Sequence, residues 1–483
     1  MATPLFRSAA LRDLERRAAA GLPAGTLMQR AGEAAAAWIV RRFPQAHRIV
    51  LLCGPGNNGG DGYVCATALR AAGREVACIA LGAPSTDDAQ GAAARWRATG
   101  GPTHDRFSPE LRCDLGIDAM FGIGLARPLS GIWLDAARWL SALPGGCVAL
   151  DVPSGLDADT GAWVGDAPGV HATATVSFLG GKPGLFTGDG VDACGAVVLD
   201  ALGIDLPGTD AALNAPGEFA DVARPRLRNT HKGRFGNVVV TGGAAGMVGA
   251  ALLAARAALR LGAGRVYVDA IDGSLDVDQQ MPELMFRRAD SLDEPFVTVI
   301  GCGLGDGAPA RERLAQALQR TQPCVLDADA LNLLAADRSL RSRHDASASA
   351  ASRVLTPHPR EAGRLLGVEA SQVQSDRVEA AREIARRFGA TVVLKGAGSI
   401  VATPDRYWIN PTGGPALASA GTGDVLAGMI GALLAQGFAP TSAVLAAVWL
   451  HGSAADRFGA DIGLTAGDIA LLAARDLARL RRA

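Results

Sequence analysis

Cysteine is scarce in this sequence and is never closely paired. The eight cysteines among 483 residues stand at positions 53, 65, 78, 113, 147, 194, 302 and 324, and no two of them form a C-x-x-C pair. Such isolated cysteines exclude a disulfide framework and a zinc site built from thiolates. Most of them lie in apolar segments, which is typical of small buried side chains in a reducing compartment.

Long hydrophobic runs are also missing. The apolar stretches are short, such as Ala443–Leu450, whereas a helix needs about 18 consecutive apolar residues to cross a bilayer. Charged residues between Arg12 and Arg17 leave no hydrophobic signal sequence near the N-terminus. We therefore expect no membrane association and a cytoplasmic location.

Neither sign of charge predominates. The 47 Lys and Arg residues are balanced by 48 Asp and Glu residues, which gives a net charge of -1. Because proteins that bind nucleic acid usually carry a basic excess, we exclude nucleic acid as a partner. With 49% hydrophobic residues the chain can bury sizeable cores, and small molecules are the expected partners.

Length and pattern together predict two α/β domains. The chain is about three times the roughly 150 residues of a typical domain. In both halves, short runs rich in Val, Ile and Leu alternate with segments of helical period, the pattern of parallel strands joined by crossover helices. Pro and Gly interrupt this pattern between Gly203 and Arg228. We place the boundary there and predict domains at residues 1–213 and 214–483.

Each half is expected to form its own sheet. The strands predicted for the first half are Arg48–Cys53, Glu75–Leu81, Leu115–Phe121, Cys147–Asp151, Thr173–Leu179 and Ala196–Ala201. Those predicted for the second half are Asn237–Thr241, Arg265–Ala270, Val297–Gly301, Cys324–Asp327, Val354–Thr356, Thr391–Lys395 and Ser399–Thr403. Helices are predicted between them, as at Gly62–Ala72 and Ile132–Leu143. The stretch Ser339–Arg353, rich in Ala and Ser, is predicted to be an exposed loop.

A glycine-rich segment follows the first predicted strand. The glycines at positions 54, 56 and 59 fit the dinucleotide-binding pattern G-x-G-x-x-G, but the acidic residue of the next strand, Glu75, begins that strand instead of ending it. Asp61 would also oppose a pyrophosphate at the helix N-terminus. A dehydrogenase site is therefore disfavoured, and Asn57, Asn58 and Asp61 offer oxygen ligands and hydrogen-bonding groups instead.

Two further strand ends carry carboxylates. Asp118 lies at the end of one predicted strand, and Asp151 is followed closely by Ser154 at the end of another. Because ligands collect at the carboxyl ends of parallel strands, the three loops are expected to converge on one site. Their side chains are candidates for cation ligation, for binding a substrate hydroxyl or for acid-base catalysis. The alternative is that Asp118 and Asp151 only cap helices and that Asp157 only stabilises a turn.

The first half resembles the NAD(P)H-hydrate epimerase family through four ordered motifs, Leu27–Gly32, Asn57–Gly62, Phe121–Pro128 and Leu150–Asp157. This resemblance implies a Rossmann-like three-layer α/β/α domain that binds potassium. It also implies an enzyme that interconverts the R and S epimers of hydrated NADH or NADPH at C6 of the nicotinamide ring. Gln29 stands where the family motif has glutamate.

The same resemblance assigns site residues, apart from the acid and base of the reaction. The substrate-binding residues would be Asn57, Asn58, Gly59, Gly60, Asp61, Gly122, Ile123, Gly124, Leu125, Ala126, Arg127, Pro128 and Asp151. The potassium ion would be held by Asn58, Asp118 and Ser154. All three offer oxygen ligands, which suit a hard cation.

The second half has no Walker-type phosphate loop but has a glycine-rich turn before a helix. Ala420–Asp424 precedes the apolar run Val425–Gln436, so its backbone N–H groups can form an anion nest at a helix N-terminus. A hydroxyl that attacks a phosphoryl group must lose its proton, and Asp424 is the candidate base. The alternative is a turn that Asp424 only caps. His358, between two prolines, is either a rigid-turn residue or a ligand contact.

The second half resembles the ADP- or ATP-dependent NAD(P)H-hydrate dehydratase family through His231–Gly236, Thr356–Glu361, Lys395–Ser399 and Ala420–Asp424. The resemblance implies a ribokinase-like α/β/α fold and loss of water from the S hydrate as ADP, with magnesium, is cleaved to AMP and phosphate. The nucleotide would be bound by Lys395, Gly396, Ala397, Gly398, Ser399 and Gly423, and the hydrated dinucleotide by Ala263, Gly305, His358 and Asp424. Asn410–Ala416 departs from the family's usual N-P-G pattern.

The sequence therefore predicts a bifunctional, homo-oligomeric repair enzyme for hydrated NADH and NADPH, known as NADHX and NADPHX. An alternative is an ATP-dependent small-molecule kinase of the ribokinase type fused to a dinucleotide-sensing module. A further alternative makes the first half a potassium-dependent dinucleotide-binding scaffold without catalytic activity. Turnover of the hydrates with ADP, compared with turnover of alcohols with ATP, separates these alternatives.

Overall fold

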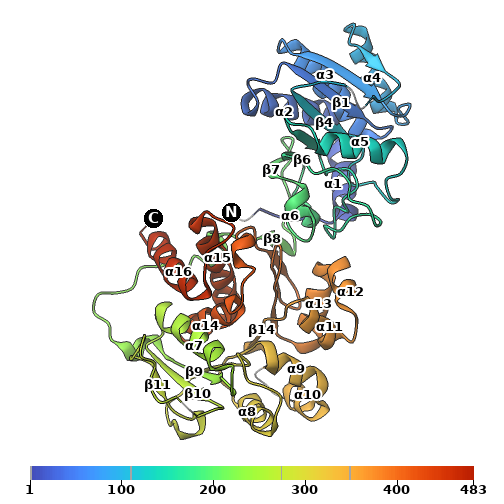
Figure 1. Cartoon of the computed structure of the whole chain (residues 1–483). Helices are drawn as coiled ribbons and strands as arrows, with labels where there is room; N and C mark the ends of the chain where they lie inside the picture. The colour runs from blue at the N-terminus through green and yellow to red at the C-terminus, as the bar shows by residue number, and fades with distance from the viewer. Residues whose placement is uncertain (1–2, 109–110, 274, 347–349, 483) are drawn as a thin grey trace. The chain divides into compact units, whose positions relative to one another are not determined.

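The computed structural model describes residues 3–108, 111–273, 275–346 and 350–482. They form two compact units, Thr3–Thr209 and the chain from Asp210 onward (Figure 1). Each unit has its own sheet flanked by helices, which confirms the predicted two-domain α/β fold. Within the described residues, no helix combines the length and the apolar character that crossing a membrane requires.

The first unit is built on a seven-stranded sheet in the order β3-β2-β1-β4-β5-β6-β7, and all its strand pairs are parallel. Its strands are β1 (Arg48–Cys53), β2 (Glu75–Ala80), β3 (Thr103–His104), β4 (Leu115–Ala119), β5 (Cys147–Leu150), β6 (Ala174–Phe178) and β7 (Ala196–Asp200). Its helices are α1 (Ser8–Ala20), α2 (Thr26–Arg42), α3 (Asn57–Ala71), α4 (Asp87–Ala98), α5 (Ile132–Ser141) and α6 (Gly190–Ala193). The strand order reverses between β1 and β4, and this is where a crevice forms at the carboxyl ends of the strands.

Alternate residues of β1 face opposite helical layers. Ile49, Leu51 and Cys53 belong to the core that includes α1, α2, α3 and α4, whereas Val50 and Leu52 pack with α5. This alternation is the period-two pattern of a strand buried on both faces. The unit is thus a three-layer α/β/α sandwich.

The second unit is built on a ten-stranded sheet in the order β11-β10-β9-β12-β13-β14-β15-β16-β17-β8. Its strands are β8 (Ala211–Leu213), β9 (Asn237–Gly242), β10 (Arg265–Ala270), β11 (Met285–Phe286), β12 (Val297–Ile300), β13 (Cys324–Leu326), β14 (Arg353–Leu355), β15 (Thr391–Leu394), β16 (Ile400–Ala402) and β17 (Tyr407–Ile409). Only β16 is antiparallel to its neighbours β15 and β17. The order reverses between β9 and β12, so a second crevice is expected there.

Helices cover both faces of this second sheet. They are α7 (Val248–Arg260), α8 (Ala308–Gln319), α9 (Ala328–Ala336), α10 (Arg338–Asp345), α11 (Pro359–Leu366), α12 (Ala370–Ser375), α13 (Arg377–Phe388), α14 (Thr422–Ala435), α15 (Pro440–Phe458) and α16 (Ala466–Leu480). Val238 and Val240 of β9 lie in the core with α7, α14, α15 and α16, whereas Val239 packs with Tyr267 and Phe296 on the other face.

Each predicted strand is present, with its ends shifted by at most two residues. Four strands were not predicted, namely β3, β8, β11 and β17. All four have two or three residues and lie at or next to a sheet edge, so they are too short to show a period. Residues 211–213, which the sequence division places in the first domain, form β8 and pair with β17 of the second sheet.

The prediction of an exposed loop at Ser339–Arg353 is wrong for its first half. Helix α10 begins after Asp337, whose carboxylate accepts hydrogen bonds from the backbone N–H groups of Ser339 and Leu340. Leu340 and His344 are buried on one side of this helix, so packing outweighs the polar composition. Residues 347–349 lie outside the described part of the chain.

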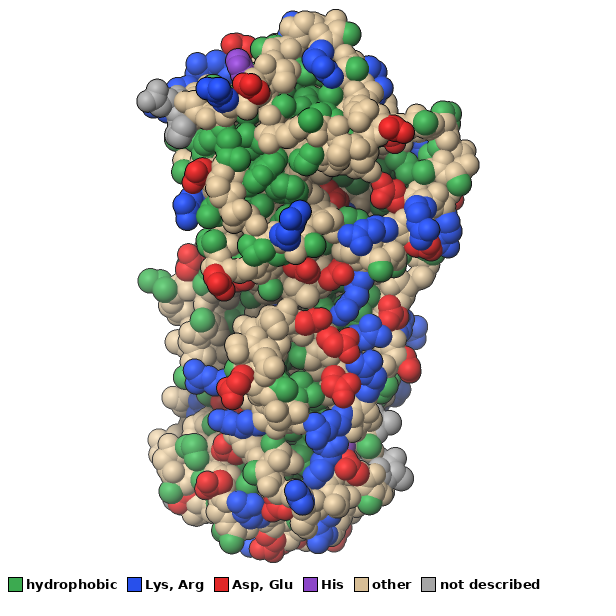
Figure 2. All heavy atoms as spheres, turned by 90° about the vertical axis from the view of Figure 1, so that its right-hand side faces the viewer, with side chains coloured by type: hydrophobic (Ala, Val, Ile, Leu, Met, Phe, Trp, Pro, Cys, Tyr) green, Lys and Arg blue, Asp and Glu red, His purple; other side chains and the backbone are tan. Residues whose placement is uncertain are grey.

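The surface carries both signs of charge. Figure 2 shows Lys and Arg side chains intermixed with Asp and Glu side chains over the face that it draws. This distribution agrees with the net charge of -1.

Candidate active sites

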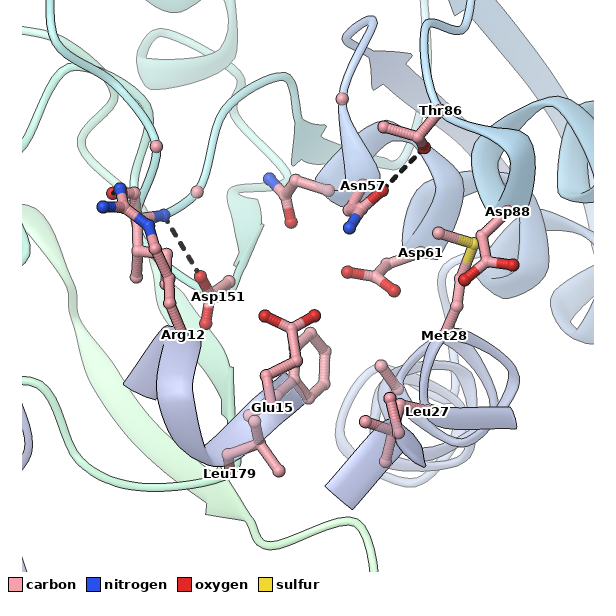
Figure 3. Close-up of a pocket in the computed structure, with 18 of the residues that line it drawn as sticks. Arg12, Glu15, Leu27, Met28, Asn57, Asp61, Thr86, Asp88, Asp151 and Leu179 are labelled. Atoms are coloured by element: carbon pink, nitrogen blue, oxygen red, sulfur yellow. Dashed lines mark hydrogen bonds between the residues drawn. The ribbon is translucent and has the colours of Figure 1, made fainter. Parts of the chain in front are cut away.

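The first unit has a pocket of about 630 Å³ at the crevice between β1 and β4. Its walls are formed by the loops that follow these two strands, by α1, by the start of α2 and by residues 85–88 before and within α4 (Figure 3). The pocket therefore lies where the strand order predicts a ligand.

Two glycines let the loop after β1 pass close to its neighbours. A Cβ atom on Gly54 would lie 1.9 Å from the backbone oxygen of Met120, and one on Gly59 would lie 1.9 Å from that of Gly54. Larger residues would force the loops of the crevice apart. Helix α3 begins at Asn57, five residues before the predicted start, so the predicted polar residues lie in its first two turns.

Most of the residues assigned to substrate binding line this pocket. They are Asn57, Asn58, Asp61, Gly122, Ile123, Gly124, Leu125 and Asp151. Asn57 is oriented by Thr86, whose hydroxyl donates to its Oδ1 at 2.7 Å. The remaining assigned residues, Gly59, Gly60, Ala126, Arg127 and Pro128, are not part of the lining. Gln29, where the sequence departs from the family motif, donates to Glu33 and also lies outside it.

Four carboxylates line the pocket, those of Glu15 on α1, Asp61 on α3, Asp88 on α4 and Asp151 after β5. Burial raises the pKa of Asp61 well above its usual range, and the carboxylates of Asp151 and Glu15 raise it further. Burial, together with Asp151, also raises the pKa of Glu15. Figure 3 shows the side chains of Glu15, Asp61 and Asp151 pointing into the same space. The pocket therefore favours protonated carboxyl groups and positive charge.

Asp151 is held by a buried lysine. The Nζ atom of Lys182 lies 2.5 Å from Asp151 Oδ1 and also donates to Ser177 Oγ and to the carbonyl oxygen of Phe178, both at 2.8 Å. Asp151 has a φ of 68°, in the left-handed region that residues other than glycine rarely adopt. The ion pair fixes this strained residue in one orientation and gives its carboxylate a cationic partner.

The three residues assigned to the cation are buried. The Ser154 hydroxyl donates to Asp118 Oδ1, and the Ser154 N–H donates to Asp118 Oδ2, both at 2.7 Å. Burial raises the pKa of Asp118 to about 6, although these hydrogen bonds oppose the shift. Among the described residues, the amide oxygen and nitrogen of Asn58 have no hydrogen-bond partner. A bound cation would satisfy this orphaned amide oxygen, so Asn58 fits the predicted potassium site.

Sequence reasoning missed Glu15, Lys182, Arg12 and Asp88 in this pocket. Helical spacing was a usable signal for Glu15, because residue 15 follows the buried Leu11 by one turn of α1. A lysine within the apolar segment after β6 was a signal for Lys182, since lysine is almost never fully buried without a partner.

In the second unit, several strand ends meet the start of α14. Gly421 precedes this helix in the left-handed conformation, with a φ of 88°, and Asp424 lies in the first turn. Burial raises the pKa of Asp424 to about 6, and the nearby Asp327 adds to the shift, whereas a hydrogen bond with Cys302 opposes it. A carboxylate with a pKa near neutrality is suited to general base catalysis.

Asp327, at the end of β13, connects the groups around Asp424. Its Oδ1 atom lies 2.7 Å from Lys395 Nζ and accepts a hydrogen bond from the Thr356 hydroxyl at 2.7 Å. Burial lowers the pKa of Lys395, but the carboxylates of Asp327 and Glu361 raise it by more, so the pKa lies above its usual value. A Cβ atom on Gly423 would lie 3.3 Å from Lys395 Nζ, so the glycine lets α14 approach the ammonium group.

His358 caps the N-terminus of α11. Its Nδ1 atom accepts hydrogen bonds from the N–H groups of Arg360 and Glu361, at 3.1 and 3.2 Å. Burial lowers the pKa of His358, and Lys395 lowers it further, so the ring is neutral at physiological pH. The Nε2 atom lies 3.2 Å from Glu361 Oε1, and the side chain is 44% exposed. His358 therefore stabilises the turn before α11, and the exposed edge of its ring can also contact a ligand.

The other assigned residues lie in different places. Gly305 follows β12 and donates its N–H to Asp329 Oδ2 at 2.8 Å. Lys395–Ser399 joins β15 to β16, on the same edge of the sheet as Asp424. Ala263 is buried just before β10, with its N–H bonded to the carbonyl oxygen of Ala258. It therefore lies at the amino ends of the strands, and the fold does not bring it to the other residues.

One cluster in this unit has the spacing of a metal site. The ligand atoms of Cys302, Asp327 and Asp424 lie within 4.8 Å of one another. However, Asp327 is paired with Lys395, and burial next to Asp424 and Asp327 raises the pKa of the Cys302 thiol well above its usual range. Magnesium takes oxygen ligands, so these three side chains do not fit a magnesium ion.

Family models match both units. Residues 24–184 match the model described as the YjeF-related protein N-terminus, and residues 238–476 match the model described as NAD(P)H-hydrate dehydratase.

Similar proteins cover between about half and nearly all of the chain. The bifunctional NAD(P)H-hydrate repair enzyme Nnr of Escherichia coli is 39% identical over 471 residues, which cover 94% of this chain and 89% of the relative. An ADP-dependent (S)-NAD(P)H-hydrate dehydratase of Neisseria meningitidis is 46% identical over 260 residues, which cover 52% of this chain and 87% of the relative. The crystal structure of a ribokinase-like superfamily protein from Enterococcus faecalis covers 58% of this chain and 100% of its own, with a TM-score of 0.50 and 24% identity. This last match shows the ribokinase-like fold.

Proposed function

The chain belongs to the family of bifunctional NAD(P)H-hydrate repair enzymes, and we propose that its two units divide the repair reaction between them. The first unit interconverts the R and S epimers of hydrated NADH and NADPH, and the second dehydrates the S epimer with cleavage of ADP to AMP and phosphate. The observation that carries this proposal is the presence of an acid-lined pocket in one unit and a carboxylate base at a helix N-terminus in the other. Hydration yields both epimers, so a dehydratase specific for one needs an epimerase to consume the other.

In the first unit, the loops after β1 and β4 bind the hydrated nicotinamide. Asn57, Asp61 and Asp151 offer side-chain hydrogen bonds to it, and the segment Gly122–Leu125 forms part of the pocket wall. Asn58, Asp118 and Ser154 would hold a potassium ion, whose positive charge would screen the buried Asp118 carboxylate. The orphaned amide of Asn58 supports this assignment.

In the second unit, Asp424 accepts the proton of the C6 hydroxyl as the hydroxyl oxygen attacks the terminal phosphoryl group of ADP. AMP leaves with the electron pair of the broken P–O bond. The phosphate ester at C6 then departs as phosphate, C5 loses a proton, and the C5–C6 double bond of the reduced nicotinamide is restored. The raised pKa of Asp424, about 6, supports its role as the base.

The nucleotide is proposed to lie along Lys395–Ser399 and against Gly423. The backbone N–H groups at the start of α14 and the ammonium group of Lys395 offer positive charge to the phosphates. Because Cys302, Asp327 and Asp424 do not suit magnesium, a magnesium ion would be held by the phosphates of the nucleotide. The cytoplasmic location and the homo-oligomeric state stay predictions.

The proposal is tested by incubating the full chain with ADP and a mixture of the R and S hydrates. The expected result is conversion of both epimers to reduced dinucleotide, with one AMP formed for each molecule restored. The conversion is measured by the near-ultraviolet absorbance of the reduced nicotinamide. Turnover of candidate alcohols with ATP, and none of the hydrates with ADP, would support the kinase alternative instead. Binding of the hydrates without exchange of the epimers would support the scaffold alternative for the first unit.

A further inference from the structure

The pocket of the first unit contains two carboxyl groups that face each other and that no assigned motif uses for catalysis. Resting on the proposed epimerase function, we propose that Glu15 and Asp61 invert C6 of the hydrated nicotinamide, with Asp61 as the acid on one face of the ring and Glu15 as the base on the other. Glu15 projects from α1 and Asp61 from α3, and both carboxylates point into the pocket (Figure 3).

Among the described residues of the pocket, Glu15 and Asp61 lack a partner, as Asp88 at the start of α4 does, whereas the other ionisable side chains are paired or hydrogen-bonded. Within the described part of the chain, neither Glu15 nor Asp61 forms an ion pair or a side-chain hydrogen bond. Asp151 is paired with Lys182, and the guanidinium group of Arg12 donates to the carbonyl oxygen of Ile123 at 3.0 Å. Glu15 and Asp61 are therefore free to exchange protons with a bound molecule.

The charged groups around Glu15 differ from those around Asp61, and this difference indicates which of the two is the acid. Asp151 and Asp88 face Glu15 together with the cations Lys182 and Arg12, whereas Asp61 faces Asp151, Glu15 and Lys182. Carboxylates that share a cavity cannot all ionise, so one of them retains its proton near neutral pH. Burial and the neighbouring carboxylates raise the pKa of Asp61 well above its usual range, which favours Asp61 as the protonated partner.

The chemistry balances without any further reactant. The Asp61 carboxylic acid protonates the C6 hydroxyl, the C6–O bond breaks, and water leaves with the electron pair of that bond. The ring nitrogen N1 shares its lone pair and forms a C6=N1 iminium ion. A water molecule on the opposite face attacks C6 and gives its proton to Glu15. The reverse reaction, or exchange with solvent, returns both groups to their starting states.

The charge of the pocket suits this route. The iminium ion is positive, and the pocket holds four carboxyl groups around a space in which the buried cation Lys182 is already paired with Asp151. Fixed negative charges placed where positive charge develops lower the barrier to reaction. A pocket of this composition would oppose a reaction that builds up negative charge on the substrate.

The first test uses variants of the full chain and follows epimer exchange by NMR. Glu15→Gln and Asp61→Asn are each expected to slow exchange by about 10² to 10⁴-fold, the usual effect of losing a positioned acid or base. Glu15→Asp, which keeps the carboxyl group on a shorter side chain, should recover part of the loss. Asp13→Asn is the matched control, because Asp13 lies on the same helix but pairs with Arg16 and Arg17 outside the pocket.

The ADP-dependent dehydration by the second unit reports whether each variant is intact. If the parent chain does not exchange the epimers, the proposed function of the first unit is wrong. If the parent exchanges them and either Glu15→Gln or Asp61→Asn stays within a few fold of its rate, only the acid-base assignment is wrong.

Two measurements on the parent chain test the route without any substitution. In water labelled with ¹⁸O, each enzymatic inversion should introduce labelled oxygen at C6, and inversion with retention of the original oxygen overturns the proposal. The pH-rate profile should be bell-shaped, falling at low pH as Glu15 is protonated and at high pH as Asp61 ionises. A rate that is independent of pH on both sides of neutrality also overturns it.

Discussion

Lys395 and Asp327 form an ion pair of 2.7 Å beside the carboxylate of Asp424. Burial and Asp327 raise the pKa of Asp424, whereas Lys395 lowers it. The pair therefore sets the strength of the candidate base, and its two members act in opposite directions. This relationship leads to two predictions about the pH dependence of dehydration.

The first prediction concerns the parent chain. Asp424 has a pKa of about 6, and only its ionised form can accept a proton, so the base is active above this pH and is lost below it. We expect kcat/KM for dehydration to fall about tenfold for each pH unit below the pKa. The measurement is a pH-rate profile with the S hydrate and saturating ADP. A rate that stays constant down to pH values well below 6 would contradict the role of Asp424.

The second prediction is that Lys395→Met moves this acidic limb to higher pH. The substitution removes the cation that lowers the pKa of Asp424 and that Asp327 and Glu361 share. The KM for ADP should rise as well, because Lys395 is proposed to contact the nucleotide. Epimer exchange by the first unit serves as the internal control and should not change. An acidic limb at the parental pH would show that Lys395 does not tune Asp424.

The third prediction is that Asp424→Asn slows dehydration by about 10² to 10⁴-fold, since asparagine keeps the size of the side chain but cannot accept the proton. ADP should still bind, because the N–H groups at the start of α14 are unchanged. The matched control is Asp468→Asn in the capping box of α16, which keeps an accepting oxygen and should cost less than about 1 kcal/mol of stability and little activity. Dehydration by Asp424→Asn within a few fold of the parent would reduce Asp424 to a structural cap.

The fourth prediction concerns potassium. A cation that satisfies the Asn58 amide should stabilise the first unit by about 2.7 kcal/mol at one hundred times its Kd, or about 5 to 10 °C in Tm. Asn58→Ala should abolish this increase. Asn57→Ala should retain it, because the Asn57 amide oxygen is held by Thr86 instead. The measurement is the Tm in potassium chloride against that in choline chloride, and equal values for the parent would exclude the site.

Much of the fold could be predicted because most strands are buried on both faces. Runs such as Arg48–Cys53 and Arg265–Ala270 are mostly apolar, and glycine or acidic residues follow within three positions, so the strand and the loop after it are both visible in the sequence. Edge strands of two or three residues, such as β3 and β11, leave no such signal. Helix α10 was missed because its stability comes from an N-cap and two buried residues within a polar segment.

The candidate sites could be predicted only where glycine-rich strand ends mark them. Asn57, Asp61 and Asp424 lie in such segments. Asn57 and Asp61 line the pocket of the first unit, and Asp424 lies in the first turn of α14. Glu15 and Lys182 come from a helix and a loop far along the chain from the glycine motifs, so only the tertiary fold brings them into the pocket. Ala263 also lies between glycines, but it precedes β10 and so lies at the opposite edge of the sheet from the other site residues. A glycine-rich segment alone therefore does not identify a site residue.

The last prediction is that the two units fold separately and that the position of the cut decides the stability of the second. Strand β8 pairs with β17, and the Asn214 side chain donates to Asn410 Oδ1 at 3.0 Å and to the carbonyl oxygen of Leu445 at 2.9 Å. A fragment of residues 210–483 keeps this strand, whereas 214–483 loses it and exposes the edge of β17. At about 1 kcal/mol for each lost backbone hydrogen bond, we expect the shorter fragment to be less stable by a few kcal/mol.

The measurement is urea unfolding of the fragments, and the matched control is the pair 1–209 and 1–213. Residues 210–213 belong to the second unit, so their addition should leave the stability of the first fragment unchanged while they raise that of the second. The reciprocal result, in which residues 210–213 stabilise the first fragment, would move the boundary to residue 213. Failure of both 1–209 and 210–483 to fold without each other would show that the chain is one cooperative unit.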